Sequence, residues 1–247
     1  MEKEIRNRFT KEYDISKFES AWEEYQNLPE FKINENVDDV GGISEEAHYI
    51  MRLVAQYHLE ECFRAMKIDI NDPNVEGERG TPYRIIKMWT GHGLDDPTEL
   101  LSGRWSKKPR LATFPNEHHK AIPITKRVDV VAVCSHHMAP FSTKFREDAY
   151  AIVSYIPGEK VLGISKLQRI VDWVARRGWL QEDLTMKIYE EISKAAETES
   201  VCVRLYNLVH TCESLRGAQS EDGAFTSEYY GGEFNDPEIR RQVFQNI

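Results

Sequence analysis

The sequence predicts an α+β fold in which helices come first and antiparallel strands follow. In the first third of the chain, apolar residues recur at three- and four-residue steps, the spacing of amphipathic helices. From residue 128 onward the pattern changes to short runs rich in β-branched and aromatic residues, interrupted by two consecutive helical segments. Short connections between strand-like runs favour antiparallel pairing, and this order of elements is typical of the α+β class.

The composition is that of a globular protein. The chain has 247 residues, of which 40% are hydrophobic and 11% aromatic, and its net charge is −9. This charge argues against a broad nucleic-acid or anionic-membrane surface, although it allows a local anion pocket. The N-terminus is too charged for a secretion signal, and no apolar run reaches the ~18 residues of a membrane span. We expect a soluble cytoplasmic protein that binds neither nucleic acid nor membrane.

Two helices are expected before residue 70. Apolar residues at helical spacing predict the first helix between Asp14, a suitable N-cap, and about Leu28. The polar segment 34–42 ends in two glycines and is expected to be a hinge. A longer helix is predicted to begin after Ser44 and to end near Met66.

A third helix follows a turn around residue 72. Thr81 is the predicted N-cap and Pro82 the first helical residue, where the missing N–H of proline does no harm. Arg84 and Lys87 stand three residues apart, so they should share one face of this helix. Four prolines make the segment 94–127 an irregular connection.

Two groups of metal-binding residue types lack a third ligand in the sequence nearby. His58 and Cys62 stand four apart on the second predicted helix, and His118 and His119 lie within the irregular connection. We interpret the first pair as ordinary helix residues and the second pair as exposed loop residues.

The second half of the chain should hold strands and two helices. Cys202 alternates with apolar residues in one predicted strand and is interpreted as a packed core residue. The expected strands are 128–134, 142–146, 149–156 and 200–209, and the expected helices are 165–178, 183–196 and a short one from 236. The predicted organisation is an N-terminal extension (1–43), a helical N-terminal region (44–93), the irregular connection (94–127) and a strand-containing domain (128–247).

A metal site is the main chemical prediction. Cys134 and His137 stand three apart at the end of a strand-like run, and His210 and Cys212 stand two apart further on. Four cysteines in a chain of this length do not resemble a disulfide framework, so metal binding is the better interpretation of the two beside histidines. A Zn²⁺ ion on Cys134, His137 and Cys212 would leave a position for water. His136 and His210 would then be near that water, because each belongs to a segment that carries a ligand. The ordinary pKa of an imidazole, about 6.5, suits proton transfer near neutral pH. A purely structural Cys/His cluster is the alternative.

A second group of residues indicates an anionic substrate. Ser165 and Lys166 stand at a predicted helix start and Arg169 follows, an arrangement that suits phosphate because free N–H groups and cations lie together. Arg216, four residues past a candidate ligand, is a further cation, as are the two on the third helix. Gln181 and Glu182 place a carboxylate next to an amide, and a carboxylate can accept the two N–H donors of a guanine edge.

These stretches resemble type I GTP cyclohydrolase. The resemblance covers most of residues 45 to 235 and is carried by Cys134-Ser-His-His137 with Pro140-Phe141, Tyr155-Ile-Pro157, the run from Lys160 to Arg169, Ala175-Arg-Arg177, Leu180-Gln-Glu182 with Thr185, and His210-Thr-Cys212 with Arg216-Gly217. Asp72-Pro73, Thr81-Pro82, Arg84 and Lys87 also match the helical part of the family.

The resemblance implies a tunnelling fold, in which an antiparallel four-stranded sheet carries two antiparallel helices on one face. It implies hydrolytic opening of the guanine imidazole ring of GTP, loss of formate and reclosure to 7,8-dihydroneopterin triphosphate, and a homodecamer of two pentamers with shared active sites. The roles it implies are zinc ligands Cys134, His137 and Cys212, proton-transfer residues His136 and His210, guanine anchors Glu182 and Gln181, and triphosphate contacts Ser165, Lys166, Arg169, Arg216, Arg84 and Lys87.

One departure lies in the metal motif itself. The family usually has Glu between the zinc cysteine and the first histidine, whereas this chain has Ser135, so a carboxylate that could orient a ligand or water is missing. Two other functions remain alternatives: another tunnelling-fold enzyme acting on a purine or pterin, and a non-catalytic nucleotide-binding member with structural zinc.

Overall fold

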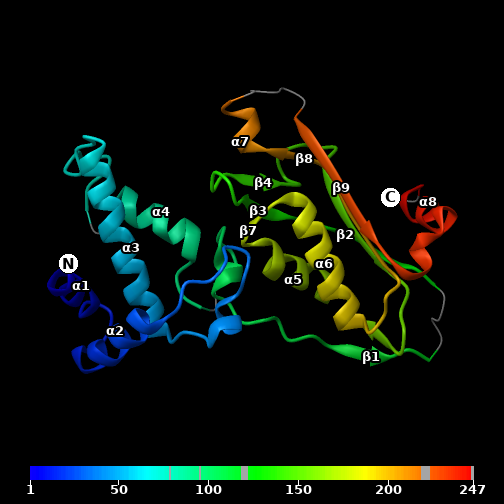
Figure 1. The fold of residues 1–247 in the computed structure, drawn as a ribbon, viewed down its shortest axis with the longest axis horizontal. Coiled ribbons are helices and arrows are strands. Elements are labelled where there is room, and N and C mark those ends of the chain that lie inside the picture. Colours follow the sequence, from blue (N-terminus) through cyan, green and yellow to red (C-terminus); the bar gives the residue numbers. More distant parts are fainter. Residues whose placement is uncertain (78, 95, 118–121, 218–222, 246–247) are drawn as a thin grey trace. The chain divides into compact units, whose positions relative to one another are not determined.

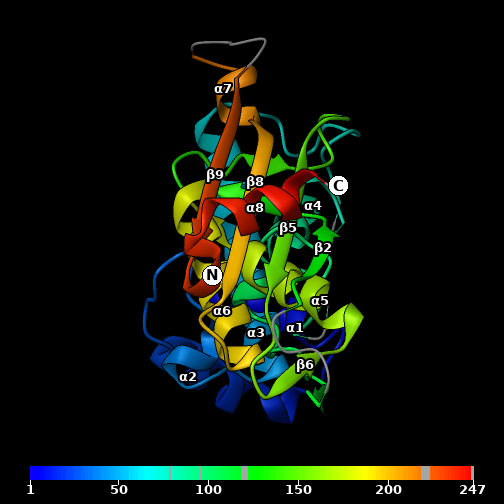
Figure 2. The same ribbon diagram turned by 90° about the vertical axis from the view of Figure 1, so that its right-hand side faces the viewer.

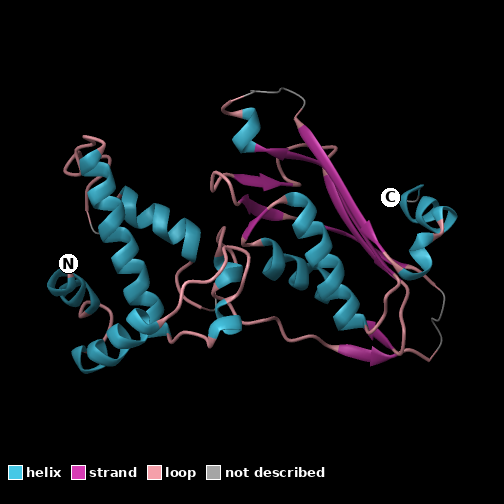
Figure 3. Ribbon diagram, viewed as in Figure 1, coloured by secondary structure: helices cyan, strands magenta, loops and turns pink. Residues whose placement is uncertain are grey.

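The computed structural model describes residues 1–77, 79–94, 96–117, 122–217 and 223–245. These residues form two compact units, Met1–Lys107 and Lys108–Ile247. The division falls within the segment 94–127 that the prolines marked as a connection. Among the described residues, helices make up the regular structure of the first unit and all strands belong to the second (Figure 3). His118 and His119 lie outside the described residues.

The first unit is a helical assembly around an aromatic core. Phe9 stacks on Tyr13, and the ring of Phe18 meets Phe9 edge-on with centroids 5.4 Å apart. Buried Ile50 and Val54 complete this core. Its elements are α1 (Glu2–Phe9), η1 (Ile15–Lys17), α2 (Phe18–Asn27), η2 (Val37–Val40), α3 (Glu45–Ala65), α4 (Thr81–Thr90) and η3 (Ser102–Arg104).

The helix starts follow the predicted caps at two of three places. The side chain of Ser44 accepts a hydrogen bond from the Ala47 N–H at the start of α3, as expected. Asp14 also caps, but its carboxylate accepts from Ser16 and begins a 3₁₀ turn that precedes α2. The prediction for Thr81 was wrong by one residue, because Gly80 is the N-cap of α4 and Thr81 is already helical.

A mostly antiparallel sheet organises the second unit. Its strands follow the order β2-β5-β8-β4-β3-β7, β9 pairs with the other edge of β8, and β3 and β7 pair in parallel. Figure 2 shows β9, β8, β5 and β2 side by side. The strands are β2 (Ile124–Val128), β3 (Val131–Cys134), β4 (Pro140–Ser142), β5 (Tyr150–Tyr155), β7 (Gly178–Trp179), β8 (Val201–His210) and β9 (Ala224–Tyr230), and β1 (Thr113–Pro115) and β6 (Lys160–Leu162) form a separate two-stranded sheet.

The α+β class is confirmed, while the details of the strands differ from the prediction. The longest strands form the antiparallel series β2-β5-β8-β9, and three short strands extend the sheet beyond the expected four. The predicted strand 128–134 is interrupted because the Gln168 side chain bonds both the N–H and the carbonyl of Asp129. The strand predicted at 142–146 ends at Ser142, whose hydroxyl donates to the Val130 carbonyl while the chain turns away.

Helices cover both faces of this sheet (Figure 1). On one face, α5 (Ile164–Ala175) and α6 (Gln181–Ala196) pack on Val153 and Val203. On the other face, η4 (Gly232–Asn235) and α8 (Pro237–Gln245) pack on Ile152 and Cys202, the alternate residues of the same strands. Cys202 is therefore a core residue, as predicted, and burial raises the pKa of its thiol to about 12. A further short helix, α7 (Thr211–Ser214), directly follows β8.

The described residues also bear on the expectations about membrane spans and about the pair His58 and Cys62. No helix among them is long and apolar enough to cross a bilayer. His58 and Cys62 do not belong to any group of potential metal ligands in the described part of the chain, and Cys62 is exposed.

Candidate active site

Short strand β4 brings the two predicted metal segments together. It pairs with β3 on one side, where Phe141 lies opposite Ala132, and with β8 on the other, where Phe141 lies opposite His210. Cys134 ends β3 and His210 ends β8, so both side chains emerge at the same end of the sheet. The Thr211 hydroxyl donates to the Pro140 carbonyl at 2.7 Å and fixes the start of α7, which carries Cys212.

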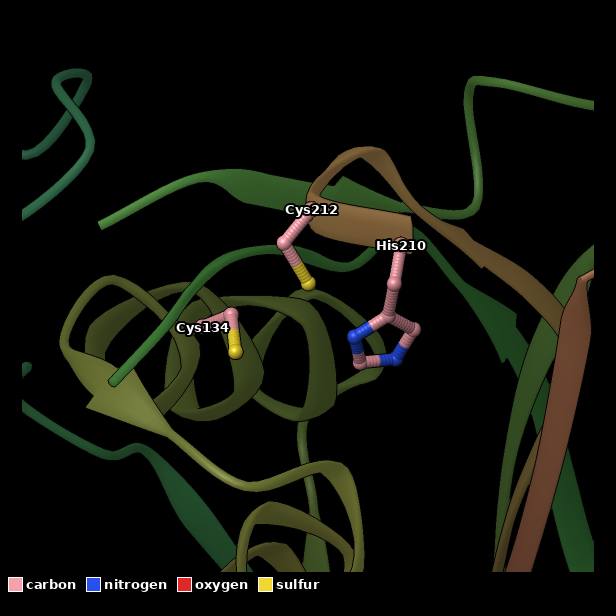
Figure 4. A group of neighbouring side chains, drawn as sticks. All are labelled: Cys134, His210 and Cys212. Carbon is pink, nitrogen blue, oxygen red and sulfur yellow. The ribbon is translucent and has the colours of Figure 1, made fainter. Parts of the chain in front are cut away.

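Cys134, His210 and Cys212 form a compact group of potential metal ligands. One ligand atom from each residue lies within 4.8 Å of those of the other two. Figure 4 shows both thiols and one ring nitrogen of His210 directed toward the same space. Burial raises the pKa of the Cys212 thiol, and the adjacent Cys134 raises it further. Two thiols and an imidazole at this separation are the donor set that zinc prefers.

His210 is held in place by aromatic rings and by an amide. Its ring stacks on Phe141 with centroids 4.3 Å apart and an interplanar angle of 8°, and Phe225 meets it edge-on at 6.2 Å. Its Nε2 lies 2.8 Å from Oε1 of Gln181. Burial lowers the pKa of His210, while the negative charge of Glu182 acts in the opposite direction.

The Gln181 hydrogen bonds determine the tautomer of His210. Gln181 is 1% exposed, and its amide nitrogen donates to the Phe225 carbonyl at 3.1 Å and to the Ser227 hydroxyl at 3.0 Å. Its oxygen must therefore face the imidazole and accept a hydrogen bond from the Nε2–H group. The lone pair of the neutral ring is then on Nδ1, where it can bind a metal or accept a proton.

The two histidines that follow Cys134 are both exposed. His137 Nε2 lies 2.6 Å from Nη1 of Arg216, and the left-handed conformation of Met138, with φ 54°, ends the turn that carries them. The structure thus brings together two of the three predicted ligands, Cys134 and Cys212. It places His210 beside them, and His137 contacts a predicted phosphate-binding arginine.

The predicted substrate residues lie at helix starts and on exposed surface. Ser165 and Lys166 are in the first turn of α5, whose N-cap Gly163 offers no side-chain hydrogen bond to the helix N–H groups. Ser165, Arg169 and Glu182 are exposed and Lys166 is half-buried, whereas Gln181 is buried. Arg84 and Lys87 lie on α4 of the first unit, where Arg84 is exposed.

Sequence reasoning missed the supporting residues on β9. Ser227 accepts from Gln181 and also lies 2.6 Å from the Thr185 hydroxyl, and Phe225 contributes both its ring and its carbonyl. The aromatic and β-branched residues of this strand, between Gly223 and Gly231, were the available signal for it.

Comparison with known proteins identifies the family. A family profile described as GTP cyclohydrolase I matches residues 56–247. The chain belongs to the GTP cyclohydrolase I family. The comparison confirms both the predicted family and the predicted enzyme class.

Individual members of the GTP cyclohydrolase I family match over most of the chain. The protein named GTP cyclohydrolase 1 of Flavobacterium johnsoniae is 31% identical over 192 residues, which cover 76% of this chain and 78% of that protein. GTP cyclohydrolase 1 of Bacillus subtilis is 32% identical over 201 residues, 80% of this chain and 98% of the relative. That of Coxiella burnetii is 32% identical over 176 residues, 71% and 89% of the two chains.

Zinc fits the residues at this site of the GTP cyclohydrolase I chain. In a tetrahedral site with Zn–S bonds of about 2.3 Å and Zn–N bonds of about 2.0 Å, the ligand atoms lie about 3.5 to 3.8 Å apart. The ligand atoms of Cys134, His210 and Cys212 are within 4.8 Å of one another, so a closure of about 1 Å would suffice.

Proposed function

We propose that this protein is a zinc-dependent hydrolase that opens the guanine imidazole ring of GTP, releases C8 as formate and recloses the product to 7,8-dihydroneopterin triphosphate. The observation that carries the proposal is the cluster of Cys134, His210 and Cys212 at the end of the sheet in a member of this family. Bound zinc would lower the pKa of a water molecule to about 7 and supply a hydroxide nucleophile.

Cys134, Cys212 and His137 are the proposed zinc ligands. His137 lies on the same turn as Cys134 and is exposed, so its ring is accessible for coordination once it leaves Arg216. His210 keeps its hydrogen bond to Gln181 and uses Nδ1 to take up a proton. His136, the neighbour of His137, is the second proton-transfer residue.

Cations and a carboxylate bind the substrate in this proposal. Exposed Glu182 accepts the N–H donors of the guanine edge, and its charge adjoins His210. Gln181, whose amide is already bonded to β9, supports this contact by holding His210. The triphosphate is bound by the uncapped start of α5 and by cations, some of them from a neighbouring subunit: Ser165, Lys166, Arg169, Arg216, Arg84 and Lys87.

The tunnelling fold and its assembly complete the proposal. The series β2-β5-β8-β9, with α5 and α6 packed on one face, supports the four-stranded tunnelling-fold domain. We expect such domains to join through their sheets into pentamers, and two pentamers to form a homodecamer.

The decisive experiment measures the products of GTP with the zinc-loaded protein. We expect release of formate and, after oxidation and dephosphorylation, fluorescent neopterin. Cys212→Ser should lose zinc and turnover together, whereas Cys202→Ser, at a core cysteine of β8, is the matched control that should keep both. Zinc-loaded protein that releases neither product would overturn the proposal.

The reaction has two stages that the products can separate. Ser135 replaces the glutamate that is usual in the family motif. Mass spectrometry of the product mixture distinguishes complete turnover from a reaction that stops at the ring-opened formamide.

A further inference from the structure

A polar cavity lies within the first unit. Its volume is about 460 Å³, in the range of small-molecule sites. Residues of α1, the turn after it, α3 and α4 line it, together with Arg79 and His92. No residue that we assign to GTP turnover is among the lining residues.

Arg52 is the central feature of this cavity. It lines the cavity although only 7% of its surface is exposed. Its Nη1 donates to the His92 carbonyl, but its Nε has no hydrogen-bond partner among the described residues. A buried guanidinium with an unused donor costs free energy unless an anion or another acceptor binds it. A buried cation in the wall of a cavity favours an anion as its neighbour.

The charge of the lining is positive. Arg8 is neutralised by Glu60, with both guanidinium nitrogens 3.0 Å from the two carboxylate oxygens, and this pair ties α1 to α3. Arg52 and Arg79 are further cations of the described lining, which has one carboxylate, that of Glu12. This excess of positive charge suits a dianion such as a phosphomonoester, which carries up to two negative charges at neutral pH.

Aromatic rings form another part of the wall. Tyr13 and Tyr49 lie with ring centroids 5.3 Å apart, and Tyr83 of α4 also lines the cavity. All three tyrosines are half-buried, so part of each ring is accessible. Such rings bind planar bases by stacking.

We propose that this cavity is a binding site for a small aromatic phosphomonoester of the size of a nucleoside monophosphate. Arg52 and Arg79 bind the phosphate, and the tyrosines contact the ring. None of the lining residues is among those assigned to GTP, and the proposal does not depend on turnover of GTP.

Calorimetric titration of the full-length protein with GMP, guanosine and inorganic phosphate tests the proposal. GMP should bind at least tenfold more tightly than either guanosine or phosphate. Only GMP has both a phosphate for the arginines and an aromatic base for the tyrosines. Arg79→Gln, at an exposed position, should weaken GMP binding at least fivefold without affecting folding. Arg52→Lys, which keeps the charge but loses the planar fork, should do the same.

Two control variants distinguish binding in this cavity from binding elsewhere on the protein. Arg64→Gln, at an exposed position on the same helix as Arg52 but outside the cavity, should bind GMP like the wild type. Arg216→Ala, in the candidate active site, should also retain binding. Absence of GMP binding at millimolar concentration would overturn the proposal. So would binding that Arg216→Ala removes and Arg79→Gln leaves intact.

Discussion

Gln181 shows how a single buried amide can set the chemistry of its neighbour. Both ends of its side chain are used, the nitrogen by β9 and the oxygen by Nε2 of His210. The contact joins residues 29 positions apart, and it leaves Nδ1 of the imidazole directed at the thiols. The rest of the ring is fixed by Phe141. His210 is therefore oriented before any substrate binds.

We predict that Gln181→Leu lowers kcat for GTP about 10- to 100-fold, because the ring of His210 loses the acceptor that fixes its tautomer. The unpartnered groups of His210 and Ser227 should also lower the free energy of unfolding by about 1 to 3 kcal/mol. Formate release and urea unfolding measure the two effects. The matched control is Gln168→Leu, which removes an amide from α5 instead of α6 and should leave kcat unchanged.

The two imidazoles near the thiols should differ in their effect on metal binding. We predict that His137→Ala lowers zinc affinity by more than about 100-fold, since the loss of a residue that merely supports a ligand already costs about 10- to 100-fold, whereas His210→Ala retains zinc and loses turnover. Metal analysis after dialysis against a weak chelator, combined with the formate assay, separates the two roles. Loss of zinc in His210→Ala and its retention in His137→Ala would make His210 the third ligand.

At the scale of elements, strong periodicity made structure predictable. The helices α3, α5 and α6 and the strands β5 and β8 all lie within a few residues of their predicted bounds. Each helix buries one regular apolar stripe, and each strand is a run of mostly apolar residues that is buried on both faces. Helix α1 was missed since Ile5 and Phe9 are its only buried residues among many charges. Strand β9 was missed because its pairing with β8 defines it, with few buried residues of its own.

The two segments of the candidate site were predictable from the local spacing of their cysteines and histidines. The local spacing of Cys134 with His137 and of His210 with Cys212 marked both segments, and the pairing of β4 with β3 and β8 brings Cys134, His210 and Cys212 together. The partner of each imidazole was not predictable. Those partners depend on side chains from α6 and α7, whose positions follow from tertiary packing.

Helix α3 contains a histidine whose burial couples stability to pH. His48 is 1% exposed, packs against Trp105 with ring centroids 5.3 Å apart, and lies near the charge of Arg52. Burial, assisted by that charge, lowers the pKa of His48 from 6.5 to about 3. Between these values the unfolded chain binds a proton that the folded chain does not, so His48 destabilises the fold progressively as pH falls below about 6.5.

We predict that His48→Leu reduces the loss of stability on acidification. The wild type should lose about 2 to 3 kcal/mol more than the variant between pH 7 and pH 4.5, because one pKa unit corresponds to about 1.4 kcal/mol. Urea unfolding at a series of pH values, followed by tryptophan fluorescence, measures the difference. Equal pH dependence in the two proteins would show that His48 is protonated in the folded state.

At the scale of the whole molecule, the second unit has strand edges that can pair with another copy. In the series β2-β5-β8-β9, both β2 and β9 pair on one side only among the described residues. Their outer edges present backbone N–H and C=O groups, which are templates for pairing with another strand. Pairing of β2 of one subunit with β9 of the next would extend the sheet around a closed ring and remove both edges. This edge geometry supports the proposed pentamer.

A shared active site makes a quantitative prediction about mixed assemblies. If Arg84 acts in the site of a neighbouring subunit, Cys212→Ser and Arg84→Ala chains should each be nearly inactive alone. Co-expressed in equal amounts with different affinity tags and purified through both, they should recover about one quarter of wild-type activity. That fraction follows because each site needs an intact cysteine from one chain and an intact arginine from its neighbour. Formate release per zinc-loaded site is the measurement.

The matched control combines two changes within the same metal cluster. Cys134 and Cys212 lie together in a single chain, so an assembly of Cys134→Ala and Cys212→Ser chains contains no intact site and should remain inactive. Recovery with Arg84→Ala but not with Cys134→Ala would place Arg84 across a subunit boundary. Failure of both mixtures would mean that Arg84 serves the site of its own chain, and sharing between subunits would then have to rest on other residues.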